Sequence, residues 1–150
     1  SALVPGAPLV MVVWRNRVDN EWLYLGQRIA EDIVSRPEQY DEPTCGPGPF
    51  SMAGADTVSD ILLHAGFEDI SLRRCDIPIM VGRDVEEAVD LVMAMGPAGE
   101  ILRLLGDRAV PVQDRVRQAL MEGYSELLGP DGVVAGASTW IVTASAPAAA

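Results

Sequence analysis

Residues 48–79 read GPFSMAGADTVSDILLHAGFEDISLRRCDIPI, and this stretch indicates a helix, a tight turn and a strand in succession. Its helical part carries four apolar residues at the spacing i, i+3, i+4 and i+7: Val58, Ile61, Leu62 and Ala65. This spacing places them along one side of an α-helix, which we expect to be buried. Gly66 can adopt the left-handed conformation that ends a helix. From Ile70 onward apolar and polar residues alternate, as in a half-buried strand.

Two further stretches indicate strands. Residues 9–14 form a continuous apolar run with β-branched residues, and a turn at Pro5 and Gly6 precedes them. Such a run is typical of a strand that is buried on both faces in a parallel sheet. Residues 138–145 indicate the last strand.

Helical spacing recurs elsewhere in the chain. One helix is predicted from Trp22 to about Ser35, because a proline at position 37 prevents its continuation. Residues 37–49 contain four prolines and two glycines without periodicity, which predicts a loop. Three further helices are predicted within about residues 84–128, with breaks at Gly96 and Gly106. We expect residues 1–150 to form one domain, with these helices as an inserted cap.

The charge of the chain limits its partners. Asp and Glu number 22 against 11 Lys and Arg, a formal net charge of -11 that repels nucleic acid and anionic membranes. No apolar run reaches the roughly 18 residues needed to cross a bilayer, and no signal-peptide pattern occurs. We therefore expect a cytoplasmic protein without nucleic-acid or membrane partners. Cys45 and Cys75 are too far apart for a metal knuckle or a redox pair.

The order of these elements resembles class I S-adenosylmethionine-dependent methyltransferases. A helix ending in Ala65-Gly66-Phe67 before an alternating strand resembles the sixth-strand unit of that family. Residues 3–14 look like its Leu-x-Pro-Gly-Gly-x-Leu lead-in to strand five, with Ala7 in place of the second glycine. Residues 140–144 are similar to its last strand. The resemblance covers the carboxyl-terminal half of the family's fold. It implies an α/β fold with a partial Rossmann-like sheet of three strands, the last antiparallel, and with covering and inserted helices.

The resemblance also implies a function. The chain would be the acceptor-binding half of a methyltransferase that acts on a small or medium-sized molecule. The family holds S-adenosylmethionine on a glycine-rich turn, and no Gly-x-Gly-x-Gly occurs here. We therefore expect no cofactor site in this chain, and no activity from it alone. Because it opens on Ser1, we expect a truncated, cleaved or tagged chain whose preceding residues bind the cofactor.

Four residues are candidates for acceptor binding. Trp14 and Arg15 lie at the carboxyl end of the first strand, where ligands of open α/β sheets bind. By the resemblance, Trp22 helps to cover the acceptor pocket and Phe50 lies near it. Core packing is the alternative for both tryptophans. His64, the one histidine, is expected on the surface, and no catalytic residue or metal-ligand group is identified.

Methionines offer a further candidate site. Met80, Met93, Met95 and Met121 could line an adaptable apolar cavity, although plain core packing is the preferred interpretation.

A second function remains open. The chain could be a complete, non-catalytic binding or oligomerisation module that retains half of a methyltransferase fold. In either case no preceding strand would pair with the edge of Leu9–Trp14. An unpaired apolar edge invites strand pairing between copies. We therefore expect a homodimer or strand exchange through this edge.

Overall fold

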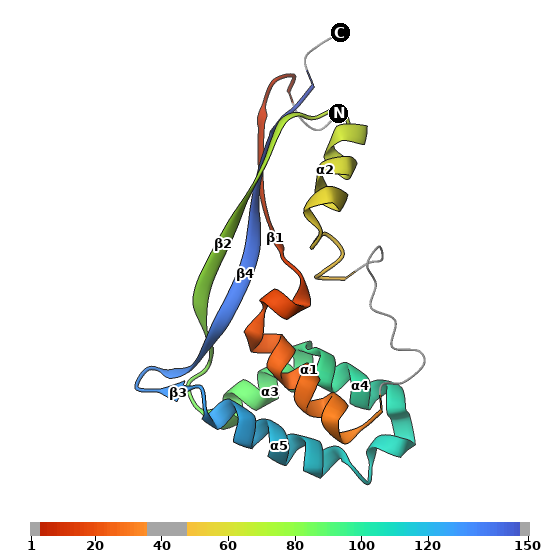
Figure 1. Ribbon diagram of the computed structural model, residues 1–150, viewed down its shortest axis with the longest axis vertical. Helices are drawn as coiled ribbons and strands as arrows, with labels where there is room; N and C mark the ends of the chain where they lie inside the picture. Colours follow the sequence, from red (N-terminus) through yellow and green to blue (C-terminus); the bar gives the residue numbers. More distant parts are fainter. Residues whose placement is uncertain (1–3, 36–47, 148–150) are drawn as a thin grey trace. The chain divides into compact units, whose positions relative to one another are not determined.

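A computed structural model describes residues 4–35 and 48–147. In these ranges the chain forms an α/β fold with five α-helices and a four-stranded antiparallel open sheet (Figure 1). The strands are β1 (Pro8–Trp14), β2 (Glu68–Gly82), β3 (Leu128–Gly129) and β4 (Gly132–Ser145). The α-helices are α1 (Glu21–Ile33), α2 (Ala55–His64), α3 (Val85–Met95), α4 (Pro97–Leu105) and α5 (Gln113–Ser125). Two short 3-10 helices are η1 (Arg17–Asp19) and η2 (Gly106–Ala109).

The last long strand lies in the middle of the sheet. The strand order is β1-β4-β2, and the short β3 also pairs with β4. β4 runs antiparallel to β1, with Leu9 opposite Ala144 and Val13 opposite Trp140. The predicted α/β class and the antiparallel direction of the last strand are confirmed, but the sheet has four strands instead of the predicted three, because the short β3 also pairs with β4.

The chain divides into two compact units. The unit that we call the sheet unit comprises Ser1–Arg17, Pro43–Asp76 and Ser138–Ala150, and the helical unit comprises Val18–Glu42 and Ile77–Ala137. The predicted cap at about residues 84–128 falls in the helical unit, which also contains α1. Most of the loop predicted over residues 37–49, including Cys45, lies outside the described residues.

The core of the sheet unit forms where α2 covers one face of the strands (Figure 1). Val58 and Leu62 of α2 are buried with Val142 and Ala144 of β4. Partly buried residues surround this core: Leu9, Met11, Val13, Met52, Phe67, Ile70, Leu72 and Trp140. Ile61 was expected on the buried side of the helix but is 49% exposed, so the buried stripe of α2 is narrower than predicted.

The predicted burial of the first strand on both faces is wrong. Val10 and Val12 are 65% and 64% exposed, whereas Leu9, Met11 and Val13 pack against the core. Successive side chains of a strand point to opposite faces, and in the sheet unit α2 covers only one of them. The apolar run therefore belongs to a strand with one exposed face.

The end of α2 follows the sequence prediction. Gly66 has a φ of 83°, the left-handed conformation that glycine adopts without strain. The Phe67 amide donates to the Leu62 carbonyl at 3.0 Å, and the Phe67 side chain packs against the core. The turn thus leads the chain from the helix into β2.

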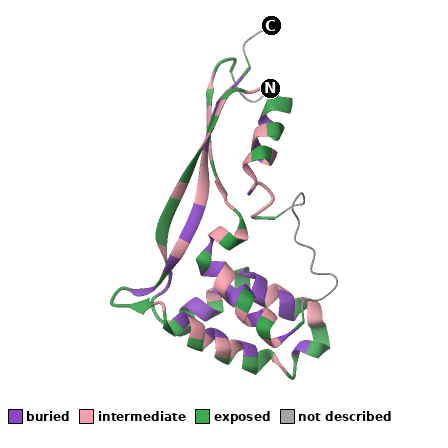
Figure 2. Ribbon diagram, in the orientation of Figure 1, coloured by how far each residue is buried: buried purple, intermediate pink, exposed green. Residues whose placement is uncertain are grey.

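Helices α1, α3, α4 and α5 form the core of the helical unit (Figure 2). Its buried residues include Leu23, Ala30, Val89, Val92, Ile101, Leu102, Val116, Leu120 and Tyr124. α3 ends and α4 begins around Gly96, as predicted, since Pro97 occupies the first position of α4. Among the described residues, no helix is both long and apolar enough to cross a membrane.

Candidate functional site

Aromatic rings and guanidinium groups gather in the sheet unit beyond the carboxyl end of β1. The rings of Trp14 and Phe50 lie with their centroids 6.5 Å apart and tilted by 41°. The Arg15 guanidinium lies over the Trp140 ring, 4.7 Å from its centroid, and the Arg17 guanidinium lies 5.4 Å from the centroid of Phe50. Both distances are within the range of cation–π attraction.

A hydrogen bond from Trp140 holds the segment that carries Phe50. The Trp140 indole Nε1 donates to the Ala53 carbonyl at 2.9 Å, and the Ser51 hydroxyl donates to the Gly48 carbonyl at 2.8 Å. The short turn before α2 is therefore attached to the middle strand. This attachment places Phe50 beside Trp14.

Polar side chains from β2, from β4 and from the residue that follows β1 meet beside these rings. Arg15 Nη1 donates to Ser138 Oγ at 3.0 Å, and Ser138 Oγ donates to Asp76 Oδ1 at 2.5 Å. Asp76 also accepts a charge-assisted hydrogen bond from Arg74 Nε at 2.6 Å, and its Oδ1 lies 3.7 Å from Arg15 Nη1. Arg15 follows β1, Ser138 belongs to β4 and Asp76 belongs to β2. The hydrogen bonds of this cluster therefore connect β4 with β2 and with the end of β1.

The carboxylate of Asp76 is stabilised in its charged form. The hydrogen bond from Ser138 is the largest cause that holds the pKa of Asp76 below its usual value. Desolvation opposes this shift, and the neighbouring charges of Arg74 and Arg15 add to it. Asp76 is therefore a permanent anion at neutral pH, suited to orienting cations rather than to exchanging protons.

The structure brings together three of the four predicted acceptor-binding residues. Trp14, Arg15 and Phe50 belong to the cluster described above. Trp22 belongs to the helical unit, where it is 6% exposed and its carbonyl accepts a hydrogen bond from the Tyr124 hydroxyl at 2.8 Å. Its surroundings match the core-packing alternative.

Sequence reasoning missed Asp76, Ser138 and Trp140 as members of this site. Asp76 and Ser138 are 62 residues apart, so no local spacing connects them. The available signal was Asp76 itself, a charged residue that stands between Cys75 and Ile77 within a strand. His64 is exposed as expected, and its Nδ1 lies 2.7 Å from the Asp60 carbonyl of its own helix.

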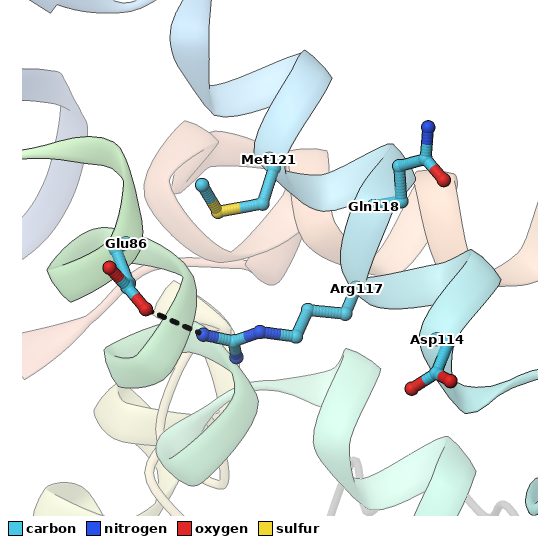
Figure 3. Close-up of a pocket in the computed structure, with 5 residues that line it drawn as sticks. All are labelled: Glu86, Asp114, Arg117, Gln118 and Met121. Atoms are coloured by element: carbon cyan, nitrogen blue, oxygen red, sulfur yellow. Dashed lines mark ion pairs between the residues drawn. The ribbon is translucent and has the colours of Figure 1, made fainter.

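The helical unit has a hollow of about 300 Å³ between α3 and α5 (Figure 3). Its lining residues are Glu86, Asp114, Arg117, Gln118 and Met121. Arg117 reaches from α5 to α3, where its Nη2 lies 2.7 Å from Asp90 Oδ1 and 3.9 Å from Glu86 Oε1. Of the four methionines that could line an adaptable site, Met121 lines this hollow, together with charged side chains (Figure 3).

The described residues match neither a metal-ion site nor the turn of a nucleotide-like cofactor site. Within them, no three His, Cys, Asp or Glu side chains are placed to hold a metal ion. The turn at Gly6 precedes a strand instead of joining a strand to a helix, so it does not fit the cradle of a nucleotide-like methyl donor. Comparison with models of known protein families and with curated proteins finds no match to this sequence.

Proposed function

We propose that this chain is the acceptor-binding half of an S-adenosylmethionine-dependent methyltransferase that acts on a small or medium-sized molecule. One observation supports this proposal above others: β4, which lies between β1 and β2, runs antiparallel to its neighbours, and an antiparallel last strand is what the resemblance implies. In this proposal the residues that grip the methyl donor precede Ser1.

The cluster at the end of β1 suits an acceptor with a planar ring. Trp14 and Phe50 offer aromatic faces, and Arg15 is fixed over Trp140 by its hydrogen bond to Ser138. Methyl transfer depends on holding donor and acceptor in line, so rigid side chains at this position would orient the acceptor. S-adenosylmethionine supplies the activated methyl group in such a reaction, and this chain would supply the orientation.

A non-catalytic binding or oligomerisation module is the second candidate. The observation that favours it is the set of contacts among Arg15, Ser138, Asp76 and Arg74, because these side chains bond to one another across the sheet. Such a cluster serves stability without any ligand. In this case Trp14 and Phe50 would cover the end of the sheet.

The test uses the longer protein that the natural reading frame encodes. We expect the codons before Ser1 to encode a glycine-rich strand-turn-helix. We also expect the longer protein to transfer a radiolabelled methyl group from S-adenosylmethionine to molecules of a small-molecule extract. A Trp14→Ala variant should raise the KM for the methylated fraction and leave the Kd for S-adenosylmethionine unchanged. Ile61→Ala, on the exposed side of α2, is the matched control and should change neither.

Two outcomes would overturn the proposal. A start codon directly before Ser1 would leave no room for the cofactor half and would favour the non-catalytic module. Calorimetric titration of the 150-residue chain with S-adenosylmethionine should give no heat of binding. Micromolar affinity there would place the cofactor site within residues that we assign to the acceptor.

A further inference from the structure

The outer edge of β1 presents backbone groups that no other described strand pairs with. β1 pairs with β4 on one side only, in the order β1-β4-β2. The Arg15 amide donates to the Ser138 carbonyl at 3.0 Å, and the Ala146 amide donates to the Ala7 carbonyl at 2.8 Å. In an antiparallel ladder alternate residues bond to the same neighbour, so the odd-numbered residues of β1 bond to β4. The amides and carbonyls of Val10 and Val12 therefore point toward the outer edge.

The edge of β1 lacks the usual devices that prevent strand pairing. Its sequence, PLVMVVW, contains no charged residue, and Pro8 occupies only its first position. The opposite edge strand, β2, carries Arg73, Arg74, Asp76 and Pro78. Charged residues and proline on an edge strand discourage pairing with another chain. β2 is thus protected, and β1 is not.

The distribution of charge favours a second copy of this chain as the partner. The sheet unit contains five acids and four arginines: Asp56, Asp60, Glu68, Asp69 and Asp76, with Arg15, Arg17, Arg73 and Arg74. Most of the formal net charge of -11 therefore belongs to the helical unit. When two copies meet through their sheet units, the surfaces in contact are nearly neutral. Repulsion between like charges therefore opposes dimerisation only weakly.

We propose that β1 pairs antiparallel with β1 of a second copy, with Met11 on the two-fold axis. Val10 of one copy then lies opposite Val12 of the other. The amides and carbonyls of these residues, which point toward the outer edge, form about four hydrogen bonds between the two copies. A strand that pairs antiparallel with its own copy satisfies the self-complementarity that a two-fold interface requires. The four exposed valines form one apolar group on the open face of the joined sheet. This interface does not depend on methyl transfer.

Removing one outward-facing amide tests the edge. The native chain should sediment as a dimer, and Val10→Pro should sediment as a monomer with an unchanged circular dichroism spectrum. Proline is tolerated on an edge strand where the amide faces away from the neighbouring strand, so the ladder with β4 should persist. Val10→Thr keeps the amide and the β-branched shape, and it should remain a dimer.

A pair of charge variants tests the register independently of proline. Val10→Lys combined with Val12→Lys sets lysine opposite lysine and should give a monomer. Val10→Lys combined with Val12→Glu sets lysine opposite glutamate across the two-fold axis and should restore the dimer. The proposal is overturned if the native chain is a monomer at high concentration. It is also overturned if the double lysine variant is still a dimer, which is the result expected if copies exchange whole strands. A monomeric lysine–glutamate variant overturns the register centred on Met11.

Discussion

Replacing Tyr124 by phenylalanine should lower the free energy of unfolding by about 1 kcal/mol, the usual net value of one buried neutral hydrogen bond. Tyr124 is fully buried in the helical unit, and its hydroxyl donates to the Trp22 carbonyl at 2.8 Å. For a chain of this size, that loss corresponds to a fall in Tm of about 3 °C.

The same hydroxyl limits what can stand at position 26. A Cβ added to Gly26 would lie 3.1 Å from the Tyr124 oxygen, closer than side chains usually approach, whereas its next neighbour, on Leu120, would be at an ordinary 3.5 Å. Alanine in a helix interior is favoured over glycine by about 1 kcal/mol, and this contact should cancel much of that gain. In the Tyr124→Phe background the oxygen is gone, so Gly26→Ala should be stabilising.

Urea denaturation of the native chain, both single variants and the double variant measures this coupling. We expect Gly26→Ala to be more favourable by about 1 kcal/mol when phenylalanine stands at position 124. Effects that add within about 0.5 kcal/mol would refute the argument, because the hydroxyl and the added methyl group would then not meet.

The pH dependence of the stability of these variants is a second test of the burial of Tyr124. Burial, the largest cause, raises the pKa of Tyr124 to about 12, although a hydrogen bond from the Gly26 backbone opposes the shift. The phenol of the unfolded chain has the ordinary tyrosine pKa of 10.0, so the unfolded state loses its proton first as the pH rises. This part of the stability should be fully present below pH 10 and should be lost, by about 3 kcal/mol in total, as the pH rises through 12. Tyr124→Phe should lack this part of the loss.

Three further predictions concern the sheet unit. The hydrogen bond from Ser138 lowers the pKa of Asp76. The native chain should therefore lose stability relative to Asp76→Asn as the pH falls below about 4. Urea titrations in which both chains lose stability equally in acid would count against this hydrogen bond. Leu62→Ala should cost about 3 kcal/mol in thermal or urea unfolding, whereas Ile61→Ala on the exposed side of the same helix should cost less than about 1 kcal/mol. Gly66→Ala should cost about 1 kcal/mol in the same assay because its φ is 83°, and a neutral result would mean that the turn relaxes without strain.

The sequence predicted the helices well because their signals are local. Apolar spacing indicated α3 and α4, the breaks at Gly96 and Gly106 marked where they end, and Gly66 marked the end of α2. Burial of β1 was predicted wrongly because an apolar run does not tell whether one or two faces are covered. Val10 and Val12 belong to the same run as Met11 but point to the exposed face.

The polar half of the candidate site could not be predicted because it depends on strand order. Asp76 meets Ser138 only because β4 lies between β1 and β2. Trp14 and Arg15 were identifiable because the end of a strand is recognisable in sequence. A tryptophan at a helical position, such as Trp22, gives no signal that separates a core residue from a binding residue, since either role needs the same apolar face.

The three tryptophans are divided between the two units, so intrinsic tryptophan fluorescence can report the unfolding of each unit separately. Trp14 and Trp140 belong to the sheet unit and Trp22 to the helical unit. Fluorescence of a chain that retains only Trp22 would follow melting of the helices, and a chain that lacks only Trp22 would follow melting of the strands. Coincident curves would mean that both units unfold in a single cooperative step, and separate curves would give each unit its own melting temperature.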